Sequence, residues 1–176
     1  LGAAVIDADA NARAVTAAGG EAMDAIRAAF GEAMLTPEGA LDRQRMRELA
    51  FRDPAAKQRL EAIVHPLVGL RGRQQMETAI AAGKRCAVFD IPLLVESGRW
   101  RAQLDAVLVV DCPESTQIAR VVQRSGIAED TVRAIIATQA PRALRLAAAD
   151  AVIYNEGIAL TQLEAEVAAF AQSFGL

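Results

Sequence analysis

The sequence contains few of the residues that mark disulfide-rich, metal-binding or membrane-spanning proteins. Its 176 residues include two cysteines, Cys86 and Cys112, and one histidine. Two cysteines are too few for a disulfide framework and lack the spacing of a metal site, so we expect both to be reduced in a cytoplasmic protein. No apolar run reaches the roughly 18 residues of a membrane-spanning helix, so we expect no membrane partner.

The chain also lacks a strong charge of either sign. Its 19 basic and 22 acidic residues leave a formal net charge of -3, which gives no general attraction to nucleic acid. An anionic ligand would therefore need a local cluster of arginines. Hydrophobic residues are abundant, at 53% of the chain, and much of this share is alanine, which favours helices.

Four short apolar runs predict strands of a parallel sheet. They lie at residues 3–6, 86–89, 106–110 and 151–154. Continuous apolar runs are typical of strands that are covered on both faces, and helical segments separate these four runs as in βαβ units, so we predict an α/β fold. Ligands of such sheets bind at the carboxyl ends of the strands. The polar residues found there are the first candidates for chemistry: Asp7, Asp90, Asp111 and Asn155.

Helical patterns fill most of the remaining chain. Residues 21–30 and 41–51 predict helices, and Asp53-Pro54 predicts an N-cap followed by a proline in the first helical position. That third helix is predicted to break at His65-Pro66 and to resume beyond it. Further helices are predicted at residues 114–123, 129–138, 142–149 and 160–174.

The helical segments suggest how the chain is organised. Residues 11–84 are too many for a simple crossover between two strands, so they predict a mostly helical substrate-binding subdomain. Residues 114–149 predict a second helical cluster. Both belong to one predicted domain that spans residues 1–176.

Acidic residues follow the first two strands. Asp7 and Asp9 could hold the water of a metal ion or accept a hydroxyl proton, or Asp9 could simply cap the next helix. Asp90 precedes the turn Ile91-Pro92, where nucleotide-binding folds carry their Walker-B carboxylate, although a plain turn and helix cap explain it equally well. His65 could be a base or a phosphate ligand, or a structural hydrogen-bonding residue.

Four arginines recur on two neighbouring helical segments. Arg120 and Arg124 are four residues apart, and Arg142 and Arg145 are three apart, so each pair shares a helix face. Each guanidinium could donate two hydrogen bonds to the oxygens of a triphosphate. The simpler interpretation is that the four arginines lie on solvent-exposed helix faces.

The turn after the last strand is a further candidate. Asn155 offers an amide side chain, and Gly157 offers exposed backbone. These groups could form hydrogen bonds with the edge of an adenine, or the segment could be a plain turn.

Several of these segments occur together, in this order, in one known family. The first elements are Ile6-Asp7-Ala8-Asp9, His65-Pro66-Leu67 and Pro92-Leu93-Leu94-Val95-Glu96. Later come Asp111-Cys112-Pro113 and a final Tyr154-Asn155-Glu156-Gly157. Over essentially its whole length, the chain resembles the bacterial dephospho-CoA kinases.

The resemblance implies a fold and an activity. The fold is the P-loop NTPase kinase-like one, with three layers around a parallel sheet, a helical CoA-binding insertion and a helical lid. The activity is the ATP-dependent phosphorylation of the ribose 3′-hydroxyl of dephospho-CoA, with Mg²⁺ accompanying ATP and no metal ligand in this chain. The implied protein is a cytoplasmic monomer or small homo-oligomer that binds no nucleic acid.

The resemblance also implies roles for individual residues. Asp9 matches the family's candidate base, and Arg142 matches a lid arginine over the ATP phosphates. Other residues implied at ATP are Arg120, Arg124, Arg145, Asn155 and Gly157. Residues implied on the dephospho-CoA side are Asp7, His65, Asp90, Leu93 and Glu96.

One part of the family's pattern is absent from this sequence. The family opens with a strand, a Gly-x-x-x-x-Gly-Lys-Ser loop that cradles phosphates, and a helix, immediately before the segment that matches Leu1-Gly2. We therefore expect a chain that begins at Leu1 to be inactive by itself, with unpaired edges on the two strands beside the missing central one. Two rival interpretations are a non-catalytic homologue without the loop and another small-molecule kinase of the adenylate or shikimate type.

Overall fold

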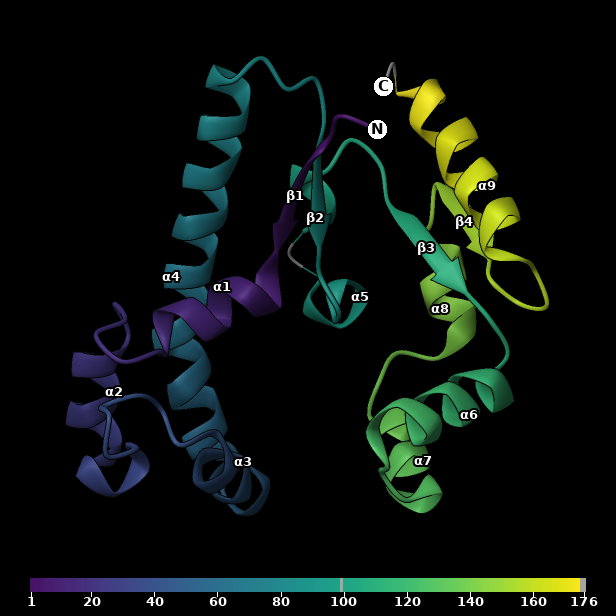
Figure 1. Cartoon of the computed structure of the whole chain (residues 1–176). Helices are drawn as coiled ribbons and strands as arrows, with labels where there is room; N and C mark the ends of the chain where they lie inside the picture. The colour runs from purple at the N-terminus through teal and green to yellow at the C-terminus, as the bar shows by residue number, and fades with distance from the viewer. Residues whose placement is uncertain (99, 175–176) are drawn as a thin grey trace. The chain divides into compact units, whose positions relative to one another are not determined.

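A computed structural model describes residues 1–98 and 100–174 of the chain (Figure 1). The chain divides into two compact units. The first comprises Gly2–Pro92, and the second comprises Leu1 together with the residues from Leu93 onward. The predicted helical regions 11–84 and 114–149 lie one in each unit. Among the described residues, no helix is both long and apolar enough to cross a membrane.

In the first unit, two strands that are distant in sequence pair directly. Strands β1 (Ala4–Asp7) and β2 (Ala87–Asp90) run parallel, in a register that sets Asp7 against Asp90. The chain between them is mostly helical, as the sequence predicts. Its helices are α1 (Ala8–Val15), α2 (Met23–Phe30), the 3₁₀ helix η1 (Glu32–Met34), α3 (Arg43–Arg52) and α4 (Pro54–Ala81).

The core of this unit lies among its helices. Val15 of α1 and Ile26 of α2 are fully buried. The buried cluster around them is completed by Ala22, Met23, Leu35, Leu41 and Met46. Helix α1 also packs along α4. Since α1 follows β1 directly, this packing fixes the direction in which the chain leaves the strand.

Helix α4 covers one face of the β1–β2 pair. Its buried Gly72 lies so close to the strands that a Cβ there would be 3.6 Å from the Ile6 side chain and 3.7 Å from Phe89. Side chains alternate between the two faces of a strand, so Val5 and Val88 lie on the other face. Val5 is 71% exposed and Val88 is 46% exposed. The apolar runs predict cover on both faces, but the described residues of this unit cover only one.

Helix α4 continues through Pro66, so the predicted break at His65-Pro66 is wrong. The helix begins where the sequence indicates, because the Asp53 side chain accepts the Ala55 N–H at 2.9 Å and Pro54 follows in the first turn. A proline in a helix interior removes one hydrogen bond and crowds the preceding turn. Side chains before and after the proline nevertheless pack against one core: Ile63, Val64, Leu67 and Val68. This shared packing holds both halves of α4 in line.

The second unit contains another parallel pair of strands. Strands β3 (Leu108–Asp111) and β4 (Ala151–Tyr154) have a register that sets Asp111 against Tyr154. Helix α9 (Leu160–Ser173) lies beside β4 (Figure 1). The remaining helical elements are α5 (Leu94–Ser97), the 3₁₀ helix η2 (Arg101–Gln103), α6 (Glu114–Ser125), α7 (Glu129–Ala137) and α8 (Arg142–Ala147).

The predicted α/β character and the parallel direction of the strands are confirmed, with small shifts in the boundaries. β4 lies where it is predicted, whereas β1, β2 and β3 each end one residue later. Asp7, Asp90 and Asp111 are therefore the last residues of their strands. Among the described residues, the strands form two separate two-stranded sheets. The further strand expected before Leu1 stays a prediction.

Because Pro66 is exposed and lies inside a continuous helix, Pro66→Ala should stabilise the protein. The change restores a main-chain N–H and relieves the preceding turn, which is worth about 3 kcal/mol in a helix interior. The more flexible unfolded chain offsets up to about 1 kcal/mol of this gain. We expect the free energy of unfolding in urea to rise by about 2–3 kcal/mol. Pro54→Ala is the matched control, because proline is favoured at a helix start, and it should give no gain. An unchanged Pro66→Ala variant would contradict the prediction.

Candidate functional site

In the first unit, the carboxyl ends of β1 and β2 bring two carboxylates together. The parallel register places Asp7 next to Asp90. The Asp7 Oδ1 atom accepts the Ala10 N–H at 2.8 Å, and its Oδ2 atom lies 3.6 Å from an Arg13 nitrogen. Asp90 is exposed. Asp7 is therefore engaged at both oxygens, whereas the neighbouring Asp90 faces solvent.

Asp9 occupies the first turn of α1, two residues after β1 ends. It is exposed, and none of the described residues donates a hydrogen bond to it or pairs with it. The N-cap of α1 is Asp7, so the alternative interpretation of Asp9 as the helix cap is wrong. A carboxylate near a helix N-terminus is favoured by the helix dipole. Asp9 is thus a charged group that remains available to a ligand.

His65 lies on an exposed face of α4, inside the helix. It is seven residues before Gly72, where α4 meets the strands, which corresponds to roughly 10 Å along the helix axis. Its predicted role on the substrate side stays a prediction.

The second unit contains an ion pair that joins β3 to α8. The Arg142 Nε atom donates to both Asp111 oxygens, at 2.9 and 3.0 Å, and its Nη2 atom donates to Oδ2. The Asp111 side chain is 4% exposed, whereas that of Arg142 is 49% exposed. The sequence indicates both residues but not the contact between them, because 31 residues separate them.

The pair shifts the pKa of both partners in the direction that keeps them charged. The hydrogen bonds from Arg142 are the main cause that lowers the pKa of Asp111, and they outweigh burial, which raises it. The hydrogen bond to Asp111 raises the pKa of Arg142 further above its already high value. Asp111 is therefore an acceptor for Arg142 at every pH near neutrality.

The segment before α8 is held from two sides. The Ala140 N–H donates to the Glu96 Oε1 atom at 2.7 Å, and the Ala140 carbonyl accepts from Arg145 at 3.0 Å. Pro141 follows and is the N-cap residue of α8. The structure thus brings Glu96 and Arg145 to one short segment that leads directly into Arg142. Leu93, at the start of this unit, is 50% exposed.

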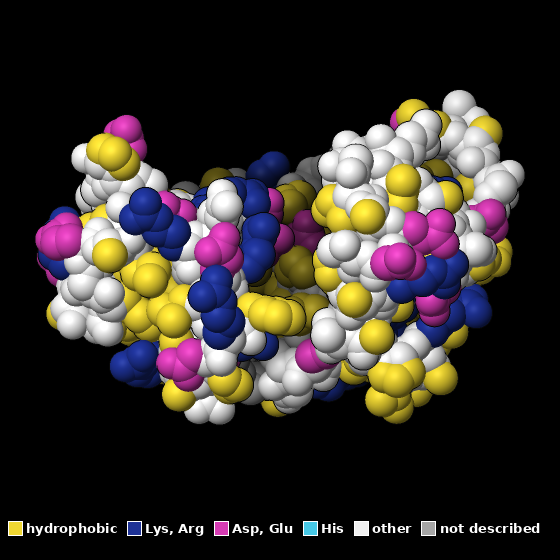
Figure 2. Space-filling view, turned by 90° about the horizontal axis from the view of Figure 1, so that it is seen from below, with side chains coloured by type: hydrophobic (Ala, Val, Ile, Leu, Met, Phe, Trp, Pro, Cys, Tyr) yellow, Lys and Arg dark blue, Asp and Glu magenta, His cyan; other side chains and the backbone are white. Residues whose placement is uncertain are grey.

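The four predicted arginines differ in how they are engaged. Arg142 and Arg145 are hydrogen-bonded, whereas Arg120 and Arg124 are exposed on α6, with no ion-pair partner among the described residues. On the face that Figure 2 shows, basic side chains lie among acidic and apolar ones and form no single basic surface. A shared site for all four arginines stays a prediction.

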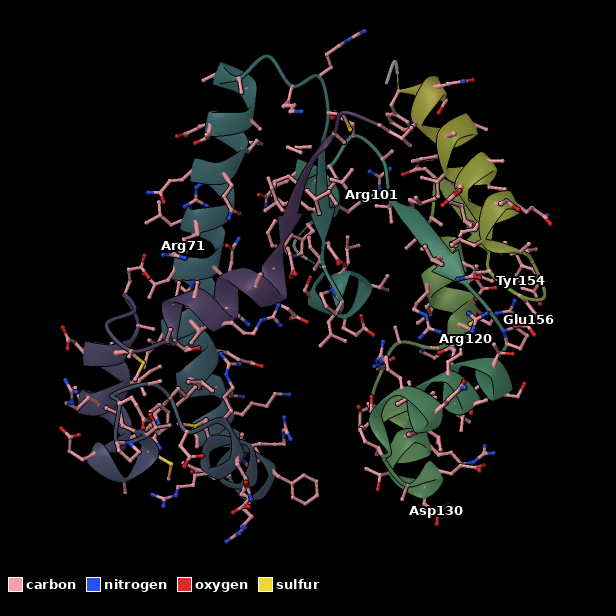
Figure 3. All side chains as sticks on the ribbon, viewed as in Figure 1. Arg71, Arg101, Arg120, Asp130, Tyr154 and Glu156 are labelled. Atoms are coloured by element: carbon pink, nitrogen blue, oxygen red, sulfur yellow. The ribbon has the colours of Figure 1, made fainter. Side chains whose placement is uncertain are left out.

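The turn after β4 contains a residue that the sequence analysis missed. The Asn155 N–H donates to the Asp111 carbonyl at 2.8 Å, and Gly157 has a positive φ of 65°, which suits glycine. Between them, the Oε2 atom of Glu156 is buried, with no hydrogen-bond partner among the described residues. Figure 3 labels Glu156 beside Tyr154, at the end of β4. No sequence pattern would have indicated this burial.

No group of three or more His, Cys, Asp or Glu side chains in the described part of the chain could hold a metal ion. The pair of Asp7 and Asp90 is the carboxylate pair that strand register creates in the first unit.

Comparisons with known proteins point to one family. The family model described as dephospho-CoA kinase matches residues 1–160. The dephospho-CoA kinase of Albidiferax ferrireducens is 54% identical over 178 residues, which cover 100% of this chain and 83% of that protein. The dephospho-CoA kinase of Bordetella parapertussis is 55% identical over 156 residues, covering 89% of this chain and 72% of that protein.

Solved structures are similar as well. TT1252 from Thermus thermophilus has a TM-score of 0.79 and 34% identity, covering 97% of this chain and 85% of that one. The dephospho-CoA kinase from Campylobacter jejuni has a TM-score of 0.63 and 23% identity, covering 98% of this chain and 85% of that one, and this likeness concerns the fold alone.

The Asp111–Arg142 pair predicts how stability responds to acid. The pKa of Asp111 is lower in the folded protein than in the unfolded chain, where it is about 3.9. The stability gained from the pair is thus complete above about pH 5 and is lost as the pH falls through the lowered pKa. We expect the Tm difference between wild type and Asp111→Asn to be constant above about pH 5 and to shrink below about pH 4. Thermal melts followed by circular dichroism measure it, and a gap that stays constant in strong acid would contradict the prediction.

Proposed function

Since the chain belongs to the dephospho-CoA kinase family and is therefore a kinase, we propose that it transfers the γ-phosphate of ATP to the ribose 3′-hydroxyl of dephospho-CoA, the last step of coenzyme A biosynthesis. The observation that carries this proposal is the 54% identity with a named relative across the whole chain. The unpaired carboxylate of Asp9 and the forked guanidinium of Arg142 support it, because phosphoryl transfer needs a group that orients the acceptor and a cation for the phosphates.

Asp9 is the proposed base for the acceptor hydroxyl. Of the three carboxylates around the ends of β1 and β2, Asp7 already accepts from Ala10 and lies near Arg13, whereas Asp9 has no partner among the described residues. A base must have a free oxygen within hydrogen-bond reach of the proton that it takes. A loose transition state needs little proton removal early, so Asp9 acts mainly by orienting the hydroxyl.

The second unit supplies the proposed contacts with ATP. Arg142 lies over the end of β3 and presents a half-exposed guanidinium, which suits a phosphate oxygen. Arg120 and Arg124 add unpaired positive charge on α6, and Arg145 supports the segment before Arg142. Asn155 and Gly157 form the proposed contact with the adenine.

Mg²⁺ is proposed to accompany ATP. Proteins commonly hold this ion by one or two carboxylates and by substrate phosphates, and the exposed Asp90 at the end of β2 fits the role of holding its waters. When bound, the ion would neutralise charge on the phosphates as the bond to the leaving group breaks.

The remaining proposals concern the dephospho-CoA site, the two helical regions and the oligomeric state. We propose that Asp7, His65, Asp90, Leu93 and Glu96 face dephospho-CoA, with Glu96 using the oxygen that Ala140 leaves free. Residues 11–84 are the proposed CoA-binding subdomain, and the lid belongs to residues 114–149. The protein is proposed to work in the cytoplasm as a monomer or small homo-oligomer.

The complete gene product should phosphorylate dephospho-CoA and neither AMP nor shikimate. The expected selectivity follows from the family match along the whole chain. A coupled assay of ADP release with each acceptor measures it. Equal or faster turnover with AMP would favour an adenylate-type kinase. Absence of turnover with every acceptor would favour the non-catalytic homologue.

Asp9→Asn should lower kcat by about 10²-fold and leave the KM for ATP nearly unchanged, because Asp9 is proposed to act on the acceptor and not on the nucleotide. Asp24→Asn is the matched control, since Asp24 is also an exposed acid in the first turn of a helix, α2. It should retain near wild-type kinetics. Steady-state rates with both substrates varied give the result. An Asp9→Asn variant with wild-type turnover would remove Asp9 from the mechanism.

A further inference from the structure

We propose that Asp111 is a positioning residue that fixes the guanidinium of Arg142 so that its free edge meets the phosphates of ATP. The proposal rests on the proposed function, and it gives a role to a residue that the sequence analysis left without one. The two-armed contact between the two side chains joins the end of β3 to the start of α8.

The fork leaves part of the guanidinium free. An arginine side chain has five N–H donors in one plane. Asp111 accepts from Nε and from one N–H of Nη2, so both N–H groups of Nη1 and one of Nη2 remain. The Arg142 side chain is 49% exposed, and Asp111 is the hydrogen-bond acceptor that the described residues give it, so a second acceptor can bind the remaining N–H groups. A phosphate, whose oxygens accept from paired N–H groups, has the matching shape.

Asp111 is well placed to fix a partner because it is itself fixed. It ends β3, its main-chain carbonyl accepts from Asn155, and its side chain is almost completely buried. Arg142 is fixed from the other direction, since the preceding Ala140 is bound by both Glu96 and Arg145. Arg142 therefore loses its rotamer freedom during folding and not during nucleotide binding. Binding of the nucleotide then costs less conformational entropy.

A second cation also acts on Asp111. Asp111 alone would neutralise Arg142, but the positive charge of Arg145 is near enough to lower the pKa of Asp111 as well. Two cations thus act on the Asp111 carboxylate, while the Glu96 carboxylate accepts the Ala140 N–H of the same segment. The alternative is that Asp111 and Arg142 form only a structural bridge between β3 and α8, and this alternative makes different kinetic predictions.

Asp111→Asn is the first test, made in the complete gene product. Asparagine keeps the shape of the side chain but replaces one acceptor oxygen with an NH₂ donor, so only one of the two arms of the contact with Arg142 can form. We expect kcat/KM for ATP to fall by about 10- to 100-fold, with the KM for dephospho-CoA unchanged. An Asp111→Asn variant with a lowered Tm and wild-type kcat/KM would overturn the proposal, because a structural bridge predicts that result.

Asp150→Asn is the matched control. Asp150 also pairs with an arginine in the same unit, since the Arg101 Nη2 atom is 3.0 Å from its Oδ1 atom and the Val107 N–H donates to Oδ2 at 2.8 Å. It precedes β4, so it lies at the opposite end of the strands from Asp111. Its kcat/KM for ATP should stay within about twofold of wild type. An equal loss in both variants would mean that any broken bridge impairs the enzyme and would overturn the proposal.

A double-mutant cycle with Arg142→Ala tests whether Asp111 acts through Arg142. If it does, adding Asp111→Asn to Arg142→Ala should cost little further activity. Losses that add would overturn the proposal. Calorimetry measures the affinity of the same variants for a non-hydrolysable ATP analogue without any acceptor. It therefore stays informative if the wild type fails to phosphorylate dephospho-CoA. That failure would reject the proposed function, whereas equal nucleotide affinity in wild type and Asp111→Asn would reject only the role of Asp111.

A measurement on the wild type covers the case in which Asp111→Asn does not fold. In protein labelled with ¹⁵N-arginine, the Arg142 Nε–H signal is identified by its absence from Arg142→Lys. We expect slow exchange of this proton with solvent both before and after the ATP analogue is added. Rapid exchange in the nucleotide complex would mean that the contact with Asp111 breaks on binding, and would overturn the proposal.

Discussion

Parallel pairing of the strands is the constraint on which the candidate site depends. In a parallel pair, both carboxyl ends lie at the same edge, and here each pair is in register to its last residue. That register sets Asp7 beside Asp90 in one unit and Asp111 beside Tyr154 in the other. A shift by one residue would turn these side chains to the opposite face of the sheet. The paired residues at the strand ends would then point to opposite faces.

The same constraint explains the helices. Parallel strands need a long crossover, and the one between β1 and β2 contains the buried core of its unit around Val15 and Ile26. Helix α4 is the last helix of this crossover, and it places Gly72 against Ile6 and Phe89. The cost of Pro66 inside α4 is accepted because the residues on both sides of it pack on that core. Packing of the crossover therefore holds β1 and the helix that carries Asp9.

The roles of the acidic residues follow from their partners more than from their type. Asp7, Asp9 and Asp111 are all aspartates at or just beyond strand ends. Asp7 caps a helix, Asp9 has no partner among the described residues, and Asp111 is buried against Arg142. A carboxylate without a partner can accept a proton from a substrate, and one that caps a helix stabilises the fold. A carboxylate that binds two N–H groups of an arginine orients that cation. The local geometry of each aspartate therefore determines which of these roles it can have.

The sequence by itself determined the features that depend on local pattern. Apolar runs identified β1 to β4 within two residues, Asp53-Pro54 identified the start of α4, and the order of short motifs identified the family. These signals lie within a few neighbouring residues, so no long-range contact is needed to read them.

Only the tertiary structure decided which residues meet and what each one is free to do. Packing on a distant core carried α4 through Pro66, against the local preference of proline for a break. Asp7 and Asp9 are both acids near a helix start, and only the backbone path made Asp7 the cap. The contact of Asp111 with Arg142 spans 31 residues. Such pairings arise from the way strands and helices pack in space, which no local sequence pattern records.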